Sequence, residues 1–582
     1  MNKIASKLVS FCVKYQIVLV NCLLIILGFC VLGLPYNKMG FLNDDFGVFL
    51  NCRLKSWGDV WRVLCSDMNT WTFGFKISKN FLTIVYRPIP MLLLSLEHFL
   101  WGLNAYYYYL VNILLHSINS VLIYRIFSWF LDKRLAFVGA LLFLFHGSIG
   151  SWIVLICTDQ DILNLTFFLL VVLSYKKYLD TEYFRYYALS GFLFLLCLFT
   201  REPLSIFPLG LFLFWIIIGF YKKLKVADLL INAIQKVYLF IFPLIIYVST
   251  RFVLFGFDFS DLGYLSGPNA KTIKYYIWNI LEFMKDITGF TFLSNPDPRG
   301  KILFFIPFVL LFLFLFIKNT KKIYLFVLGL AILLFSWPSL LMTHHARYIY
   351  AAIPFFILFL LIAIRYSKIN FLSGWKSWIV YMGLFVFIGW GIYDNMSKIS
   401  KNEEITHIAD LALKDFVQTY ISDDLTGREK FVFVGLAHWL FFTGLTQAVW
   451  LYSGNEQLQV YHDLNIDFIL RDYRNIESYK NIKEGFHILP IKNGYRFISH
   501  DDRLYFSVSQ PNVNKIGDEY MVPNNMMSIR IVNELFDKYK AKDVSIFFNK
   551  NYFKPEDKVM FFSWDWKEKR FVLLPNCFDF FK

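Results

Sequence analysis

The sequence has few of the features that mark several common classes of protein. Its eight cysteines are scattered along 582 residues with none of the spacings that bind zinc. No repeat of about 20–50 residues is visible, which argues against a helical repeat array. No small-residue cleavage site follows the first apolar run, so this run is predicted to be a retained membrane span and not a removed signal peptide.

The composition is that of a membrane protein. Hydrophobic residues make up 57% of the chain, and the mean hydropathy is +0.50, which is too apolar for a soluble protein. The chain has 66 Phe and 35 Tyr, and aromatic side chains are common where a protein meets lipid. A net charge of +15 is compatible with nucleic-acid binding. However, many basic residues stand in short links between apolar segments, so the expected partner is membrane lipid and not nucleic acid.

About eleven segments are long and apolar enough to cross a membrane as helices. They are residues 16–35, 106–127, 135–151, 162–175, 186–200, 203–220, 237–255, 302–317, 323–341, 349–365 and 376–393. Every second link is basic, as at Lys133 and Arg134 after the second span and at Lys176 and Lys177 after the fourth. Basic links stay in the cytoplasm. The N-terminus is therefore predicted inside, and everything after Tyr393 outside.

The chain changes character after about residue 395, where polar residues return and apolar runs shorten. We expect helices at 403–421 and 438–451 and short strands at 430–435, 488–491, 504–508, 544–548 and 571–574. The predicted fold class is therefore mainly α. It combines a polytopic membrane helix bundle (residues 1–395, with a long first outer loop at 36–105) with a soluble extracytoplasmic α/β domain (residues 396–582).

Two adjacent carboxylates, Asp44 and Asp45, follow the first span in a run without lysine. Like charges this close repel, so one of the two is expected to hold a proton more readily and to serve as a general base. A solvated loop acid or a helix cap would give the same pattern. We favour the base, because acids beside a membrane are costly when they serve no function. Cys52 and Cys65 lie in the same predicted loop, and either a disulfide or two free thiols fits the sequence.

Further polar residues stand on the predicted outer side, in the first outer loop or at the ends of predicted spans. Arg87 precedes a proline, Asp161 begins the fourth span, and Arg201 and Glu202 lie between the fifth and sixth spans. Asp161 fits either a helix N-cap or an outer cavity. An internal ion pair or a cap would account for Arg201 and Glu202 without any function.

Two more groups of polar residues lie in or beside spans. His116 shares one helix face with Tyr108, Asn112 and Asn119, and hydrogen bonding between helices is the preferred interpretation over catalysis. The turn that contains His345, Arg347 and Tyr348 combines imidazole and guanidinium groups. Arginine makes forked hydrogen bonds with phosphate, but an arginine that reaches lipid head groups would have the same position.

An ordered set of motifs covers residues 40 to 365. They are Asp44-Asp45, Arg87-Pro88-Ile89, Trp101-Gly102-Leu103-Asn104, Leu110-Val111-Asn112 with His116 and Asn119, Leu144-Phe145-His146-Gly147, Trp152, Asp159-Gln160-Asp161-Ile162-Leu163, Thr200-Arg201-Glu202, Phe207-Pro208-Leu209 and Arg347-Tyr348 with Pro354. In this order they resemble the GT-C superfamily of polytopic glycosyltransferases. The nearest pattern is the membrane part of the transmembrane and tetratricopeptide-repeat O-mannosyltransferases and their bacterial relatives. Gly147 replaces a proline of that pattern, no Gly-Arg precedes Asp161, and the repeats are absent.

The resemblance implies an inverting transfer of a sugar from a polyprenyl-phosphate carrier to an acceptor hydroxyl at the outer face of the membrane. Asp44 or Asp45 would take the proton of the acceptor. Arg347, with His345 or Arg201, would stabilise the departing phosphate. The residues expected to line the substrate cavity are Asp161, Glu202, Arg87, His116 and Tyr348.

The resemblance also bears on partners, and the acceptor would be a glycan, a lipid or a protein. The lack of a cysteine framework and the short N-terminus favour a bacterial inner membrane, with the endoplasmic reticulum as the alternative location. No cofactor is required, although a weakly bound divalent cation (Mg or Mn) at the first-loop acids fits the pattern. A lipid-linked glycan transporter or flippase, or a glycan polymerase or ligase, is the alternative function.

Overall fold

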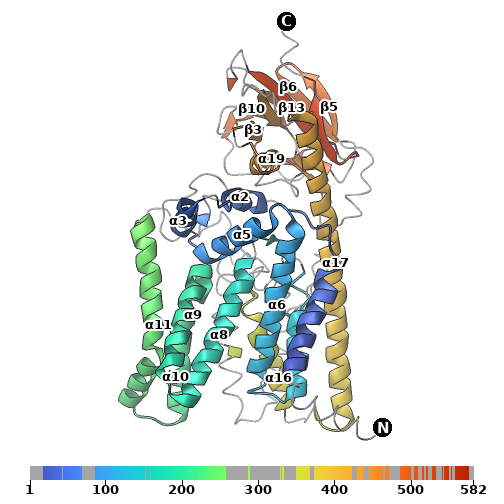
Figure 1. Ribbon diagram of the computed structural model, residues 1–582. Coiled ribbons are helices and arrows are strands. Elements are labelled where there is room, and N and C mark those ends of the chain that lie inside the picture. Colours follow the sequence, from blue (N-terminus) through green and yellow to red (C-terminus); the bar gives the residue numbers. More distant parts are fainter. Residues whose placement is uncertain are drawn as a thin grey trace. The chain divides into compact units, whose positions relative to one another are not determined.

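The structure is a computed structural model that divides into two compact units, each described here by itself (Figure 1). The first unit is Met1–Asn37, Leu54–Met68 and Lys76–Ser400, and the second is Lys38–Arg53, Asn69–Phe75 and Lys401–Lys582. The residues that the structure describes are 17–41, 44–54, 56–68, 85–150, 153–156, 159–256, 283, 286–288, 328–329, 331–332, 349–367, 372–421, 429–434, 436–437, 445–455, 457–462, 466–470, 486–499, 504–508, 514–516, 519–521, 527–531, 540–541, 543–548, 552–553, 557–565 and 567–575.

The described part of the first unit is helical (Figure 1). Its elements are the helix Ile17–Gly33 (ending in the π-helical η1, Phe29–Gly33), α3 (Trp57–Cys65), α5 (Pro88–Trp101), α6 (Ala105–Phe127), α7 (Lys133–Leu144), α8 (Asp159–Thr181), α9 (Phe184–Thr200), η3 (Glu202–Ile206), α10 (Phe207–Tyr221), α11 (Val226–Phe255), α16 (Ile353–Arg365) and the first part of α17 (Trp375–Tyr420). Short links join α8 to α9 and α10 to α11, and within each pair the helices pack together. The start of α8 and the end of α9 therefore lie at the same end of the unit.

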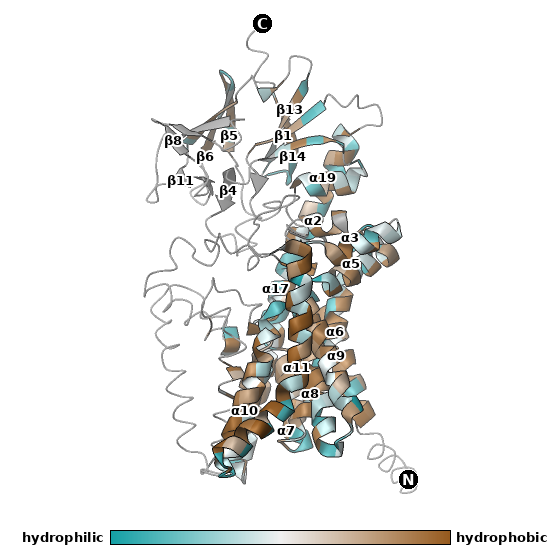
Figure 2. Ribbon diagram, turned by 90° about the vertical axis from the view of Figure 1, so that its left-hand side faces the viewer, coloured by the Kyte–Doolittle hydropathy of each residue, from teal (hydrophilic) through white to brown (hydrophobic). Residues whose placement is uncertain are grey.

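Several of these helices are candidates to cross a membrane (Figure 2). Among the described residues, five helices are long and apolar enough, and three more are apolar but shorter. The five are Ala105–Phe127, Asp159–Thr181, Glu202–Tyr221, Val226–Phe255 and Trp375–Tyr420. All of them overlap predicted spans, although α11 begins well before its predicted start at residue 237. The predicted spans 302–317 and 323–341 lie outside the described residues.

The helix α17 differs from the prediction. The sequence predicts a span at 376–393 and a separate helix at 403–421, whereas the structure has one helix of 46 residues. Lys398 Nζ pairs with Asp394 Oδ2 at 2.6 Å, one turn away, at the point where the apolar part ends. No proline interrupts the helix, so its backbone is continuous where the side chains change from apolar to polar. The division between the two units falls between Ser400 and Lys401, within this helix.

The described part of the second unit contains three β-sheets and a few helices. Their strand orders are β14-β13-β1-β3, β5-β6-β12-β10-β9-β8 and β11-β7-β4-β2. The strands are β1 (Glu429–Phe433), β2 (Leu436–Ala437), β3 (Gln459–His462), β4 (Ile466–Leu470), β5 (Phe486–Ile491), β6 (Gly494–Ser499), β7 (Leu504–Val508), β8 (Asn514–Ile516), β9 (Glu519–Met521), β10 (Met527–Ile531), β11 (Lys540–Ala541), β12 (Asp543–Phe548), β13 (Lys558–Asp565) and β14 (Arg570–Leu574). The helices are α2 (Asp44–Asn51), α19 (Leu445–Ser453) and the last part of α17.

The first sheet of this unit joins residues that are far apart in the sequence. Strand β1 lies parallel to both β13 and β3, with Phe433 opposite Phe562. Phe416 of α17 packs its ring against those of Phe433 and Phe562, each with centroids 5.1 Å away. The end of α17 is thus held by the aromatic side chains of this sheet. The predicted strand 430–435 corresponds to β1, while residues 438–444 of a predicted helix lie outside the described part of the chain.

The first predicted outer loop does not fold as one piece. The sequence predicts the whole of 36–105 as part of the membrane domain, but Lys38–Arg53 belongs to the second unit. The reason is apolar burial, because Phe46 and Phe49 of α2 are both fully buried and α2 packs on α19. Cys52 and Cys65 are free thiols in the structure.

Candidate active site

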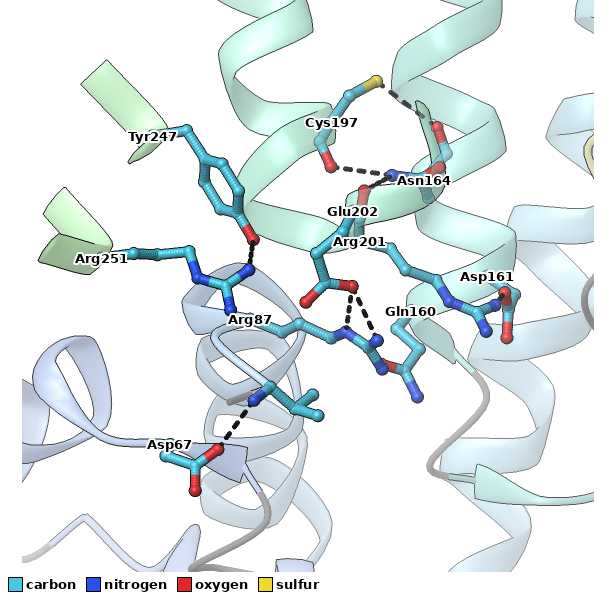
Figure 3. Close-up of polar contacts among 11 residues, drawn as sticks. Asp67, Arg87, Gln160, Asp161, Asn164, Cys197, Arg201, Glu202, Tyr247 and Arg251 are labelled. Atoms are coloured by element: carbon cyan, nitrogen blue, oxygen red, sulfur yellow. Dashed lines mark hydrogen bonds and ion pairs between the residues drawn. The ribbon is translucent and has the colours of Figure 1, made fainter. Parts of the chain in front are cut away.

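A cluster of charged and polar side chains lies at one end of the helices of the first unit (Figure 3). We call it the arginine cluster. Its members come from the start of α5, the first turn of α8, the corner between α9 and η3, and the last turns of α11. They are Arg87, Gln160, Asp161, Arg201, Glu202, Tyr247 and Arg251. These helix ends are the ones that the sequence predicts on the outer side.

Arg87 is the centre of one half of the arginine cluster. Its Nε and Nη2 atoms both donate to Glu202 Oε2, at 3.1 and 2.7 Å, and its Nη1 donates to Gln160 Oε1 at 2.7 Å. Arg87 is the residue before α5, whose first helical position is Pro88, and proline is favoured there because its missing N–H would have no partner. The planar guanidinium of Arg87 therefore links the start of α5 to Gln160 of α8 and to Glu202 of η3.

Arg201 forms the second ion pair of the cluster, with Asp161. Both side chains are only 5% exposed. Of the two interpretations of Arg201 and Glu202, an internal ion pair or a cap, the structure has ion pairs, Arg201 with Asp161 and Glu202 with Arg87. The backbone of Arg201 is extended, with φ −166° and ψ 140°, and neighbouring side chains on an extended backbone point to opposite sides.

Asn164 fixes the corner that carries Arg201. Its Nδ2 donates to the carbonyl oxygens of Cys197 at 2.7 Å and Arg201 at 3.2 Å. These carbonyls lie at the C-terminal end of α9, where the helix itself supplies no donors. The amide of Asn164 on α8 thus satisfies the end of α9 and holds the two helices together beside the ion pair.

Asp161 is not the N-cap that was one of its two predicted interpretations. The helix α8 begins at Asp159, so both Asp159 and Asp161 lie in its first turn. Carboxylates in a first turn are stabilised by the helix dipole. The pairing with Arg201 places Asp161 in the arginine cluster.

Arg251 and Tyr247 extend the cluster along α11. Arg251 Nη1 donates to the Tyr247 hydroxyl at 3.1 Å, and the arginine is only 7% exposed. Its charge also interacts with that of Glu202. The cluster therefore gathers three guanidinium groups around the carboxylates of Asp161 and Glu202, at the end of an otherwise apolar bundle.

A second pair of buried acids involves the same first turn of α8. Glu97 on α5 is 2% exposed and Asp159 on α8 is 1% exposed. Burial, together with the charge of Asp159, raises the pKa of Glu97 from 4.5 to about 9. Glu97 is therefore protonated at neutral pH, which avoids two buried negative charges next to each other.

His116 makes the hydrogen bonds between helices that the sequence predicts. Its Nδ1 lies 2.7 Å from the Tyr350 hydroxyl and its Nε2 lies 3.0 Å from the Leu144 carbonyl oxygen. Asn119, one turn on, donates to the Ile162 carbonyl at 3.0 Å and to the same Tyr350 hydroxyl at 3.2 Å. Both residues thus connect α6 to other elements of the bundle, and neither contacts a member of the arginine cluster in these bonds.

The remaining predicted site residues are placed as follows. Asp44 and Asp45 begin α2 in the second unit, and Asp45 is buried at 1% exposure. The side chain of Asp44 is outside the described part of the structure, as are His345, Arg347 and Tyr348. Within the described residues, no group of three His, Cys, Asp or Glu side chains is arranged to hold a metal ion.

Some members of these groups were not predicted as site residues. They are Glu97, Gln160, Tyr247 and Arg251. Glu97 and Arg251 are single charges within long apolar runs, and this pattern in a membrane segment is a signal of function or of a buried partner. Applying that signal to α11 would have identified Arg251.

The fold and the cluster define a polytopic membrane protein with buried charges at one end of its helices. No family model matches the chain. A segment of 144 residues is 35% identical to the protein O-mannosyl-transferase TMTC1 of Homo sapiens, covering 24% of this chain and 16% of that protein. A segment of 138 residues is 34% identical to the protein O-mannosyl-transferase TMTC3 of Mus musculus, covering 24% of this chain and 15% of that protein. The chain thus spans about a sixth of the length of these curated relatives.

The resemblance to GT-C glycosyltransferases that the ordered motifs predict is confirmed by these matches. Among solved structures, the crystal structure of ArnT from Cupriavidus metallidurans in the apo state is similar with a TM-score of 0.43 and 11% identity. The similarity covers 85% of this chain and 98% of that one. A likeness of this size supports no inference about activity.

Proposed function

We propose that the protein is a membrane glycosyltransferase that moves a sugar from a polyprenyl-phosphate carrier to an acceptor hydroxyl. The observation that supports this most is the arginine cluster at one end of an apolar bundle, in a chain with a segment similar to O-mannosyl-transferases. Burying several charges in such a bundle is costly. Binding of an anionic lipid-linked substrate would be a function for these buried charges.

The proposed reaction is an inverting displacement at the anomeric carbon. Asp44 or Asp45 takes the proton of the acceptor hydroxyl as its oxygen forms the new bond, and the bond to the carrier phosphate breaks. The lipid phosphate leaves with the electron pair. A general base of this kind commonly contributes about 10²–10⁴-fold to the rate.

Guanidinium groups are proposed to stabilise the leaving phosphate. Arg347 has this role, with Arg201 or His345 as its helper, and Arg251 is a further candidate because it belongs to the same cluster as Arg201. Fixed positive charges that face a developing negative charge lower the barrier without any reorganisation. Arg87, which is joined to Glu202 and Gln160, would hold the cavity in shape.

The remaining features of the proposal concern location and acceptor. The side of the membrane is the extracytoplasmic one, from the basic links, and the membrane is a bacterial inner membrane. The acceptor is a glycan, a lipid or a protein. No cofactor is required.

Transfer by the purified protein tests the proposal. The full chain in lipid nanodiscs is incubated with radiolabelled polyprenyl-phosphate mannose, and then with other polyprenyl-phosphate sugars, together with membrane extract as the source of acceptor. We expect label to move to an acceptor, and Asp44→Asn or Asp45→Asn to abolish that transfer while insertion into the membrane is normal. The matched control is Asp180→Asn, an exposed acid that pairs with Lys176 at the far end of α8. Full activity in both first-loop variants would refute the mechanism, and movement of the labelled carrier across a bilayer without transfer would identify a flippase.

A further inference from the structure

The helix that carries the first-loop acids is enclosed by the second unit. Phe46 and Phe49 are fully buried, and Asp45 is 1% exposed. The helix α2 packs on α19, which lies about 400 positions later in the chain. Residues of the C-terminal part of the sequence therefore form part of the surroundings of Asp45.

One chain of contacts leads from α2 to α17. The rings of Phe46 and Tyr452 meet edge to face, with centroids 6.4 Å apart. The Tyr452 hydroxyl donates to Asp410 Oδ1 at 2.6 Å, and Lys414 Nζ pairs with Asp410 Oδ2 at 2.7 Å. Phe46 is the residue after Asp45, so the position of this acid depends on the ring of Phe46, which contacts Tyr452, and the Tyr452 hydroxyl is in turn held by Asp410.

The segment before α2 is fixed on the same helix. The backbone N–H of Lys38 donates to Glu403 Oε1 at 2.8 Å, and that of Gly40 donates to Thr406 Oγ1 at 3.0 Å. A Cβ atom at position 40 would lie 2.5 Å from the Thr406 carbonyl oxygen, so only glycine fits there. The segment before α2 is thus bonded directly to residues 403–406 of α17, and Phe46 of α2 is connected to Asp410 of the same helix through Tyr452.

We propose that Phe46 and Tyr452 are positioning residues, through which α19 and the last part of α17 set the position of the catalytic acid. The proposal rests on the proposed function, in which Asp44 or Asp45 is the base. An aromatic pair suits this role because its geometry is directional and its parts are rigid. Misplacement of a reacting group by about 1 Å can cost about 100-fold in rate.

The test is a double-mutant cycle on the full chain in nanodiscs, with polyprenyl-phosphate mannose as the donor. Phe46→Leu and Tyr452→Leu each remove one ring and keep an apolar side chain. We expect each to lower kcat about 10- to 100-fold with little change in the KM for the donor. The double variant should be no slower than the slower single variant, because both act through one contact. Tyr452→Phe keeps the ring and should recover most of the rate.

The matched control is Tyr420→Leu. Tyr420 belongs to the same unit and makes an edge-to-face contact with Phe562, with centroids 4.8 Å apart. We expect this variant to lower the melting temperature like Tyr452→Leu but to leave kcat unchanged. Hydrogen exchange gives a readout that does not need activity, since the amides of α2 should exchange faster in Tyr452→Leu than in Tyr420→Leu.

The outcomes separate this proposal from the proposed function. Equal kcat values and equal α2 exchange in Tyr452→Leu and Tyr420→Leu would overturn the positioning role, even if Asp44→Asn or Asp45→Asn is inactive. Full activity in both of the latter variants would overturn the proposed base, and the positioning role with it. A loss of kcat in Phe46→Leu and Tyr452→Leu that multiplies in the double variant would also contradict a shared contact.

Discussion

Removing one member of the Arg201–Asp161 ion pair should destabilise the protein far more than removing both. Each side chain is 5% exposed, so neutralising one leaves the other charge buried without its partner. Such a loss costs about 3–5 kcal/mol, whereas replacing both charges by neutral groups of similar size is often close to neutral. We expect Arg201→Met and Asp161→Asn each to lose about this much free energy of unfolding, and the double variant to regain most of it.

Thermal unfolding of the full chain in nanodiscs, followed by tryptophan fluorescence, ranks the variants. The control is the pair Lys176–Asp180 on the same helix, with side chains 40% and 55% exposed. Exposed pairs one turn apart contribute about 0.3–0.5 kcal/mol. Lys176→Met and Asp180→Asn should therefore melt close to the wild type.

Two results would refute this reasoning. One is a double variant that loses the sum of the two single losses, since that would mean the charges are not coupled. The other is a single variant that melts like the wild type, since that would mean the remaining charge reaches water. The double variant, although stable, should transfer sugar more slowly than the wild type, because it lacks the guanidinium group proposed to face the phosphate. Stability and activity are thereby separated.

Three other predictions follow from the geometry. Because the pKa of Glu97 is raised from 4.5 to about 9 by burial and by Asp159, the folded protein holds an extra proton between these values, and its stability falls as the pH rises through that window. Glu97→Gln should flatten this decline in a series of melting temperatures from about pH 5 to 9, and parallel curves would contradict it. Arg87→Lys keeps the charge but loses the fork to Glu202 and Gln160, so transfer should slow about ten-fold at an almost unchanged melting temperature; an unaltered rate would show that the fork is dispensable. EDTA should leave transfer unchanged, because a carboxylate base and fixed guanidinium groups supply the proposed catalysis, and a loss that Mg²⁺ restores would argue for a required cation.

The helices were largely predictable because hydropathy alone defines them. The predicted segment 106–127 corresponds to α6, Ala105–Phe127. An unbroken apolar run of this length matches the length of one membrane-spanning helix, so its bounds can be predicted from the sequence. The continuity of α17 was not predictable in the same way. Hydropathy reports what surrounds a helix, and at Ser400 the surroundings change while the backbone does not.

The candidate site was predictable in its members more than in its pairs. Polar residues at span ends are visible in the sequence, and Arg87, Asp161, Arg201 and Glu202 do gather at one end of the first unit. Their pairing depends on the backbone at Arg201, which the sequence does not reveal. Arg251 is recognisable as a single charge in an apolar run, but this pattern does not indicate which residues it contacts.

The burial of α2 in the second unit was beyond sequence reasoning for a different reason. Phe46 and Phe49 look like membrane or interface residues when read beside the first span. Their contacts are with residues about 400 positions away, such as Tyr452. Non-local contacts of this kind leave no periodic signal in the local sequence.

The uninterrupted course of α17 has a practical consequence for dissecting this protein. Domains are usually separated by exposed linkers that tolerate cleavage and recombination, but here the boundary between Ser400 and Lys401 lies inside a helix. A chain cut at this point would expose four carbonyl groups on one fragment and four N–H groups on the other, all without helical partners. Fragments and chimaeras divided at this position would therefore have an unpaired helix end. A protease that cleaves exposed linkers should not cut the chain at this junction.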